Sequence, residues 1–129
     1  MEYFNSVKLM VIDDEPWIRE MLKDVLQNNG YLVKTEGNGL EALQKLKKEH
    51  FDALICDIDM PGCSGFTVLK RAKLIDSEVK IIMMTGSGNE SYYYQSMSLG
   101  ASGFFNKPFD LHQMLSVIER STGSKKRTE

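Results

Sequence analysis

The sequence is short of cysteine. Cys56 and Cys63 are the only two among 129 residues, too few for the disulfide framework of a small secreted domain. Their spacing does not match that of a zinc site, and no histidine adjoins them. We therefore expect two reduced thiols in a cytoplasmic protein.

Long apolar runs and an excess of positive charge are also missing. The longest apolar runs are strand-sized, far short of the ~20 residues that cross a membrane, and the opening MEYFNSVK lacks the pattern of a signal peptide. The net charge is −2, so no basic field favours nucleic acid. The one basic cluster, KKR at 125–127, falls in a polar tail that we place at 122–129. We expect neither membrane contact nor direct nucleic-acid binding.

Short apolar segments alternate with helical patterns along the chain. Apolar residues at i, i+3 and i+4 indicate amphipathic helices, as at Leu111, Met114 and Leu115. Asp110 suits the N-cap of this last helix, and Pro16 suits the first turn of the first one. The predicted strands are 8–13, 31–36, 53–57, 80–85 and 103–107, and the predicted helices run from Pro16 to near Gly30, through Leu43 to near His50, onward after Gly65, over 90–99, and onward after Asp110.

This alternation predicts one α/β domain, a five-stranded parallel sheet with helices on both faces. Segments 8–13, 53–57 and 80–85 are almost continuously apolar, as central strands of such a sheet are. Segment 31–36 alternates and 103–107 is short, so we expect both at the edges. With right-handed crossovers, these constraints give the strand order 2-1-3-4-5 of the flavodoxin-like fold.

Polar residues end the first, third, fourth and fifth predicted strands. In chain order they are Asp13 and Asp14, Asp57, Thr85, and Lys107. The carboxyl ends of parallel strands share one rim, where ligands bind near the switch point of the sheet. Clustered carboxylates there suit Mg²⁺, which completes its shell with water or phosphate oxygens. An aspartate such as Asp57 can attack phosphorus and form an acyl phosphate, and Lys107 would help to neutralise the charge.

Four motifs at these strand ends, VIDDE, CDIDMPGCSG, MMTG and NKPF, follow one another in this order. Together they resemble the receiver domain of bacterial two-component response regulators, over about residues 7–121. The resemblance implies a receiver domain at 1–121 with Mg²⁺ as cofactor. It implies that a sensor histidine kinase or phosphotransfer protein passes a phosphoryl group to Asp57. The domain would be a signalling phosphoacceptor rather than an enzyme, and its change of conformation would control a partner.

The same resemblance assigns the remaining roles. The metal ligands that it implies are Asp13, Asp14, Asp57 and the main-chain carbonyl of Asp59. Thr85 and Lys107 would bind the phosphoryl group, and the peptide bond before Pro108 would be cis. Phe104, with Thr85, would be the switch that moves after phosphorylation.

The sequence departs from the family pattern in three places. Position 104 is Phe rather than the commoner Tyr, so a signal through a hydroxyl hydrogen bond is absent. Glu36 stands where the family often has a small residue, and 102–103 is Ser-Gly instead of a frequently acidic pair. None of these changes touches the phosphorylation site.

The predicted fourth helix carries three consecutive tyrosines. Successive helical residues lie ~100° apart, so Tyr92, Tyr93 and Tyr94 cannot all face the core. Isolated surface aromatics are common, which is one interpretation. The other is a partner or dimer face formed by this helix with the fifth strand and fifth helix. His50 and His112 are expected to be exposed and away from the rim.

Two other functions remain open from the sequence. Asp57 and Asp59 resemble the D-x-D pair of haloacid-dehalogenase-like phosphatases, although that family places the pair on its first strand. The third hypothesis is a binding module that has lost phosphorylation. The complete set of site residues argues against it.

Overall fold

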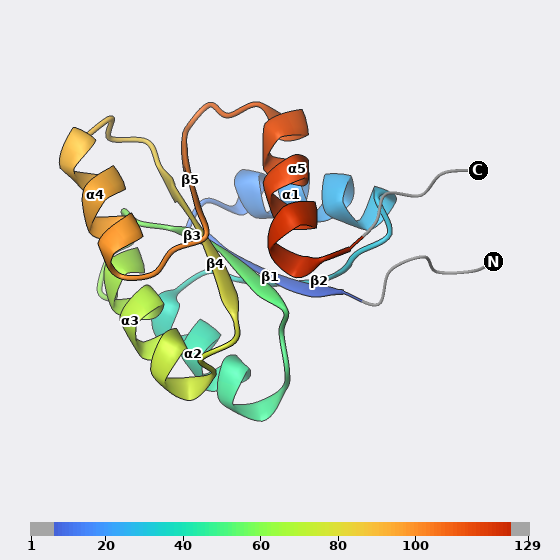
Figure 1. Ribbon diagram of the computed structural model, residues 1–129, viewed down its shortest axis with the longest axis horizontal. Helices are drawn as coiled ribbons and strands as arrows, with labels where there is room; N and C mark the ends of the chain where they lie inside the picture. Colours follow the sequence, from blue (N-terminus) through green and yellow to red (C-terminus); the bar gives the residue numbers. More distant parts are fainter. Residues whose placement is uncertain (1–6, 125–129) are drawn as a thin grey trace.

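The computed structural model describes residues 7–124, so the basic cluster at 125–127 and the end of the predicted tail lie outside the described residues. Five strands alternate with five helices, as predicted (Figure 1). In chain order they are β1 Lys8–Ile12, α1 Pro16–Asn28, β2 Leu32–Glu36, α2 Gly39–Lys48, β3 Ala53–Asp57, α3 Gly65–Ile75, β4 Lys80–Thr85, α4 Glu90–Ser98, β5 Gly103–Asn106 and α5 Leu111–Thr122. Helix α3 begins at Gly65 rather than after it, because Ser64 is the N-cap and accepts a hydrogen bond from the Thr67 amide.

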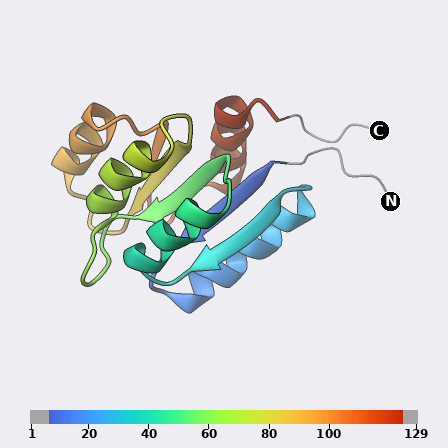
Figure 2. The same cartoon turned by 90° about the horizontal axis from the view of Figure 1, so that it is seen from below.

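The strands form one parallel sheet in the order β2-β1-β3-β4-β5, which confirms the predicted flavodoxin-like topology. Figure 2 shows neighbouring strands running in the same direction. β1, β3 and β4 are central and buried, whereas β2 and β5 lie at the two edges and are more exposed. All five carboxyl ends therefore reach the same rim of the sheet.

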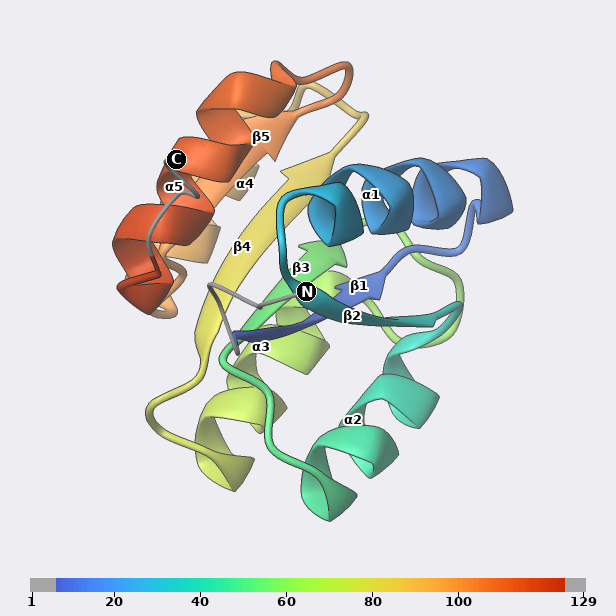
Figure 3. The same ribbon diagram turned by 90° about the vertical axis from the view of Figure 1, so that its right-hand side faces the viewer.

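Alternate residues of the central strands face two separate cores. Leu9 and Val11 pack against α1 and α5, while Met10 and Ile12 pack on the side of α2 and α3. Figure 3 shows α1 and α5 on one face of the sheet, with α2 and α3 on the other. Both cores consist mainly of buried aliphatic side chains, which hold the strand ends in fixed positions.

Candidate functional site

The rim at the carboxyl ends of the strands contains buried polar side chains. Asp13 follows β1, Asp57 ends β3 and Thr85 ends β4, and their side chains are almost completely buried. Lys107 follows β5 and points its ammonium group into the same place. The folding of four separate strands thus brings together residues that lie up to 94 positions apart in the sequence.

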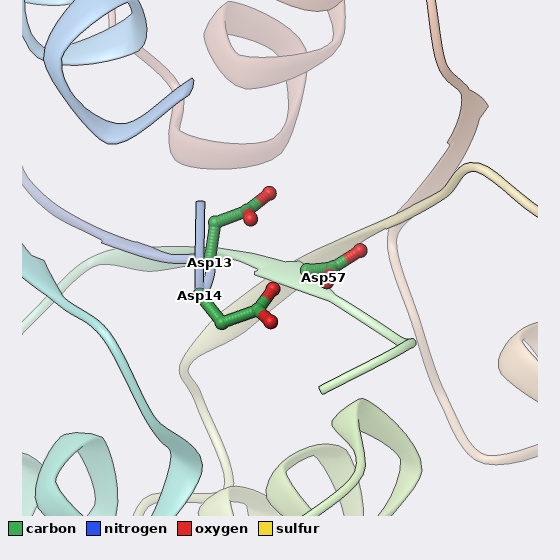
Figure 4. A group of neighbouring side chains, drawn as sticks. All are labelled: Asp13, Asp14 and Asp57. Atoms are coloured by element: carbon green, nitrogen blue, oxygen red, sulfur yellow. The ribbon is translucent and has the colours of Figure 1, made fainter. Parts of the chain in front are cut away.

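Three carboxylates meet at this rim. Asp13, Asp14 and Asp57 each offer one oxygen, and these oxygens all lie within 4.8 Å of one another. Figure 4 shows Asp13 and Asp14 beyond β1 and Asp57 on the neighbouring strand β3. Asp14 is exposed, so the group is open to solvent on one side. A set of hard oxygen donors at an open rim fits a divalent cation such as Mg²⁺.

Lys107 is the positive charge of the site. Its Nζ lies 2.9 Å from Asp13 Oδ2 and 3.1 Å from Asp57 Oδ1, and 3.5 Å from Glu15 Oε1. Burial alone would lower the pKa of Lys107, but its hydrogen bonds and charge interactions with Asp13 and Asp57 outweigh that effect and raise the pKa. Lys107 is therefore a fixed cation at neutral pH.

Asp57 is electrostatically strained despite this lysine. Burial in the rim and the nearby charge of Asp13 raise the pKa of Asp57 from 3.8 to about 6, against the opposing effect of Lys107. The acidic side of the site thus carries more negative charge than one ammonium group offsets. A bound divalent cation would offset the rest.

Thr85 has a partner that the sequence did not indicate. Its hydroxyl donates a hydrogen bond to Asp59 Oδ2 at 2.7 Å, and the Ser87 amide donates to Thr85 Oγ1 at 3.1 Å. Thr85 is fully buried, whereas Asp59 is exposed at the mouth of the site. The hydroxyl therefore has a fixed direction.

The other predicted residues border the site. The Lys107–Pro108 peptide bond is cis. Phe104 on β5 is half-buried, and its ring contacts that of Tyr93 edge-on with centroids 5.6 Å apart. Asp59 follows β3 in the loop that leads to α3.

Comparison with known proteins decides the family. The sequence model of one protein family, the response regulator receiver domain, matches residues 9–119 of this chain. This chain belongs to the receiver-domain family. The domain is 35% identical over 113 residues to sporulation initiation phosphotransferase F of Bacillus subtilis, covering 88% of this chain and 91% of that protein. It is 36% identical over 115 residues to chemotaxis protein CheY of the same organism, covering 88% and 96% respectively.

Solved structures agree with this family. A putative response regulator from Chloroflexus aurantiacus superposes on the receiver domain with a TM-score of 0.85 at 33% identity, covering 92% of this chain and 98% of that one. The chain is therefore the receiver domain of a two-component response regulator, a family of signalling phosphoacceptors. The phosphatase alternative gains no support, since the acid pair follows the first strand β1, whereas the D-x-D pair begins at the end of the third strand β3 and not on the first strand, as that alternative needs.

Sequence reasoning missed several partners of the receiver site. Arg19 Nη1 donates to the Asp13 carbonyl at 2.7 Å, and Glu15 approaches Lys107. Outside the site, Glu36 Oε2, for which the sequence offered no explanation, lies 2.6 Å from Lys45 Nζ. This ion pair links β2 to α2. Glu15 adjoins the acid pair in sequence, which was a usable signal. The contacts of Arg19 and Glu36 cross between elements and left no local signal.

The tyrosines of the receiver domain differ in exposure. Tyr92 is half-buried and packs edge-on against Phe66, whereas Tyr93 and Tyr94 are 45% and 67% exposed. The prediction that they cannot all face the core is confirmed. His50 and His112 are exposed, and Cys56 and Cys63 are free thiols, as predicted; both thiols are buried. Within residues 7–124 no helix is long and apolar enough to cross a membrane.

Proposed function

We propose that Asp57 is the phosphoacceptor of this receiver domain. The observation that supports it best is the placement of its carboxylate at the end of the central strand β3, 3.1 Å from Lys107 and within the group of three acids. An Asp57 oxygen attacks the phosphorus of a phosphohistidine, and the phosphorus–nitrogen bond breaks. The imidazole leaves with the electron pair and takes up a proton from solvent.

Asp13, Asp14, Asp57 and the main-chain carbonyl of Asp59 would hold Mg²⁺ in this proposal. Bound there, Mg²⁺ supplies charge neutralisation for the transferring phosphoryl oxygens. The buried carboxylate of Asp13 also holds Lys107 in place at 2.9 Å, so that its ammonium can contact a phosphoryl oxygen on Asp57. Thr85, at the end of the neighbouring strand β4, would donate a hydrogen bond from its hydroxyl to a second phosphoryl oxygen.

The phosphodonor would be a sensor histidine kinase or a phosphotransfer protein. A groove of about 480 Å³ beside the acids is lined by Trp17 and Met21 of α1 and by Pro108 and Phe109 after β5. Trp17 is 65% exposed. An apolar groove that adjoins the acceptor gives a donor protein a surface on which to dock. Such a partner, and the two free thiols, would place the domain in the cytoplasm.

The output surface would be the face formed by α4, β5 and α5. Tyr93 and Tyr94 are exposed there, and a second groove of about 510 Å³ is lined by Tyr93, Phe104 and Val117 among others. The contact between Tyr93 and Phe104 connects this face to the strand that precedes Lys107. Thr85 and Phe104 would act together as the switch. Because Phe104 has no hydroxyl, it would signal through a change in the packing of its ring.

The receiver domain would span 1–121, close to where α5 ends at Thr122.

The test is covalent labelling by a small phosphodonor. We expect acetyl phosphate with Mg²⁺ to add one phosphoryl group to the intact protein, as measured by mass spectrometry, and EDTA to abolish the gain. Asp57→Asn should stay unlabelled, whereas Asp24→Asn, which changes an exposed aspartate of α1, should label like the wild type. No labelling of the wild type would support the binding module, and sustained turnover of p-nitrophenyl phosphate would support an enzyme.

A further inference from the structure

The hydroxyl of Thr85 is already engaged in the unphosphorylated domain. It donates to Asp59 Oδ2 over 2.7 Å, across 26 residues of sequence and between the end of β4 and the loop after β3. Thr85 is fully buried, so its hydroxyl cannot turn to bulk water instead. A hydrogen bond from a hydroxyl to a carboxylate is among the stronger ones in proteins.

The surroundings leave one direction for the proton. The Ser87 amide donates to Thr85 Oγ1 at 3.1 Å and therefore occupies an acceptor position. Ser87 Oγ lies 3.2 Å from Thr85 Oγ1, but this neutral oxygen also accepts from the Asn89 amide at 3.2 Å. A hydroxyl has a single proton. The anionic and nearer acceptor, Asp59, is the favoured one.

In the proposed function, a phosphoryl group on Asp57 accepts a hydrogen bond from this same hydroxyl. We propose that Asp59 is a positioning residue whose carboxylate competes with the phosphoryl group for the hydroxyl of Thr85, and so holds the domain in its unphosphorylated form. This inference rests on the proposed function of Asp57. Phosphorylation replaces one anionic acceptor by another, so the affinity of the site for a phosphoryl group is lowered by the strength of the bond to Asp59.

The competition has a structural consequence beyond the site. The Ser87 amide and hydroxyl both contact Thr85, and Ser87 Oγ accepts from Asn89, the N-cap of α4. When Thr85 turns from Asp59 towards a phosphoryl group, this chain of hydrogen bonds has to rearrange. The release of Thr85 by Asp59 is thereby connected to the start of α4. This is the helix that carries the exposed tyrosines.

Simple charge repulsion between Asp59 and a phosphoryl group would also weaken binding, and a double-mutant cycle separates the two effects. Beryllofluoride with Mg²⁺ is a stable mimic of the phosphoryl group, and its affinity can be measured by calorimetry. Repulsion acts whether or not Thr85 is present, whereas competition requires the hydroxyl. We therefore compare Asp59→Ala in the wild type and in a Thr85→Ala background.

We expect Asp59→Ala to tighten beryllofluoride binding by roughly three- to tenfold more in the wild type than in Thr85→Ala. This is the range of an ordinary net hydrogen bond, because the carboxylate of Asp59 is exposed and also contacts water. Asp59→Asn, which keeps an acceptor oxygen but not the charge, should lie in between, and it gives the same cycle if the alanine variant folds poorly. If Asp59→Ala changes beryllofluoride affinity equally in both backgrounds, or weakens it, the proposed competition is wrong, while the proposed function of Asp57 still stands. A wild type that does not bind beryllofluoride would refute the proposed function as well.

Discussion

At the scale of single residues, the site has more negative charge than positive charge, with three clustered acids and one lysine. Lys107 contacts two of the three clustered acids, and its pKa is raised, so it remains charged throughout the neutral range. Asp57 nevertheless has its pKa raised to about 6, because it is buried next to Asp13. We therefore expect phosphorylation of Asp57 to depend on Mg²⁺, because a bound cation would offset the charge that Lys107 leaves uncompensated.

This imbalance predicts the effect of pH on stability. A carboxyl whose folded pKa is raised binds more protons in the folded state, so the free energy of unfolding falls as pH rises from about 4 to 6 and stays lower above that range. In EDTA, the wild type should lose about 2 kcal/mol relative to Asp57→Asn between pH 4.5 and 7.5. Urea unfolding of both proteins across this range measures the difference. Parallel stability curves would show that Asp57 is not strained.

At the scale of elements, the junction between β3 and α3 fixes the position of Asp57, the proposed acceptor. Gly65 begins α3 directly against the end of β3, and a Cβ added there would lie 2.4 Å from the Asp57 carbonyl oxygen and 2.7 Å from Ile58 Cα. These are backbone atoms that cannot turn aside. The helix can approach the acceptor strand this closely because the residue has no side chain.

We therefore expect Gly65→Ala to lower the free energy of unfolding by roughly 2 kcal/mol, since overpacking forces the backbone to shift. The same shift displaces Asp57, so labelling by acetyl phosphate should slow as well. Gly86→Ala is the matched control, because its Cβ would meet only the Lys107 side chain at 3.9 Å. Chemical denaturation and labelling rates measure both effects. A Gly65→Ala protein as stable as the control would show that the junction is not tight.

The sequence predicted elements better than it predicted contacts. The apolar runs ending in Asp13, Asp57 and Thr85 indicated strands and their order, because burial on both faces leaves a local pattern. The bond from Thr85 to Asp59 could not be predicted, since it depends on side-chain direction across two loops. The pairing of Glu36 with Lys45 was missed for the same reason.

At the scale of the whole molecule, two cores on opposite faces of the sheet hold one open rim. The helices cover the two faces of the sheet (Figure 3), and the exposed Asp14 leaves the group of acids at the carboxyl ends of the strands open to solvent. The acids at this rim repel one another in a rigid frame that cannot relax to separate them. Binding of a cation should therefore stabilise the entire domain.

Mg²⁺ should raise the melting temperature of the wild type by mass action. At one hundred times the dissociation constant, the free energy of unfolding should rise by about 2.7 kcal/mol. Asp14→Asn removes one exposed acid of the group and should reduce this shift, whereas Asp24→Asn should leave it unchanged. Thermal denaturation with and without Mg²⁺ measures the shift. Equal shifts in all three proteins would place the metal elsewhere.

The most direct test of the account is to locate the phosphoryl group on the chain. Borohydride reduces an aspartyl phosphate to homoserine, which tandem mass spectrometry identifies by position. After incubation of the domain with acetyl phosphate and Mg²⁺, we predict homoserine at position 57 alone, and none when EDTA replaces the metal. Homoserine at Asp13, Asp14 or Asp59, or labelling that is independent of Mg²⁺, would contradict the account.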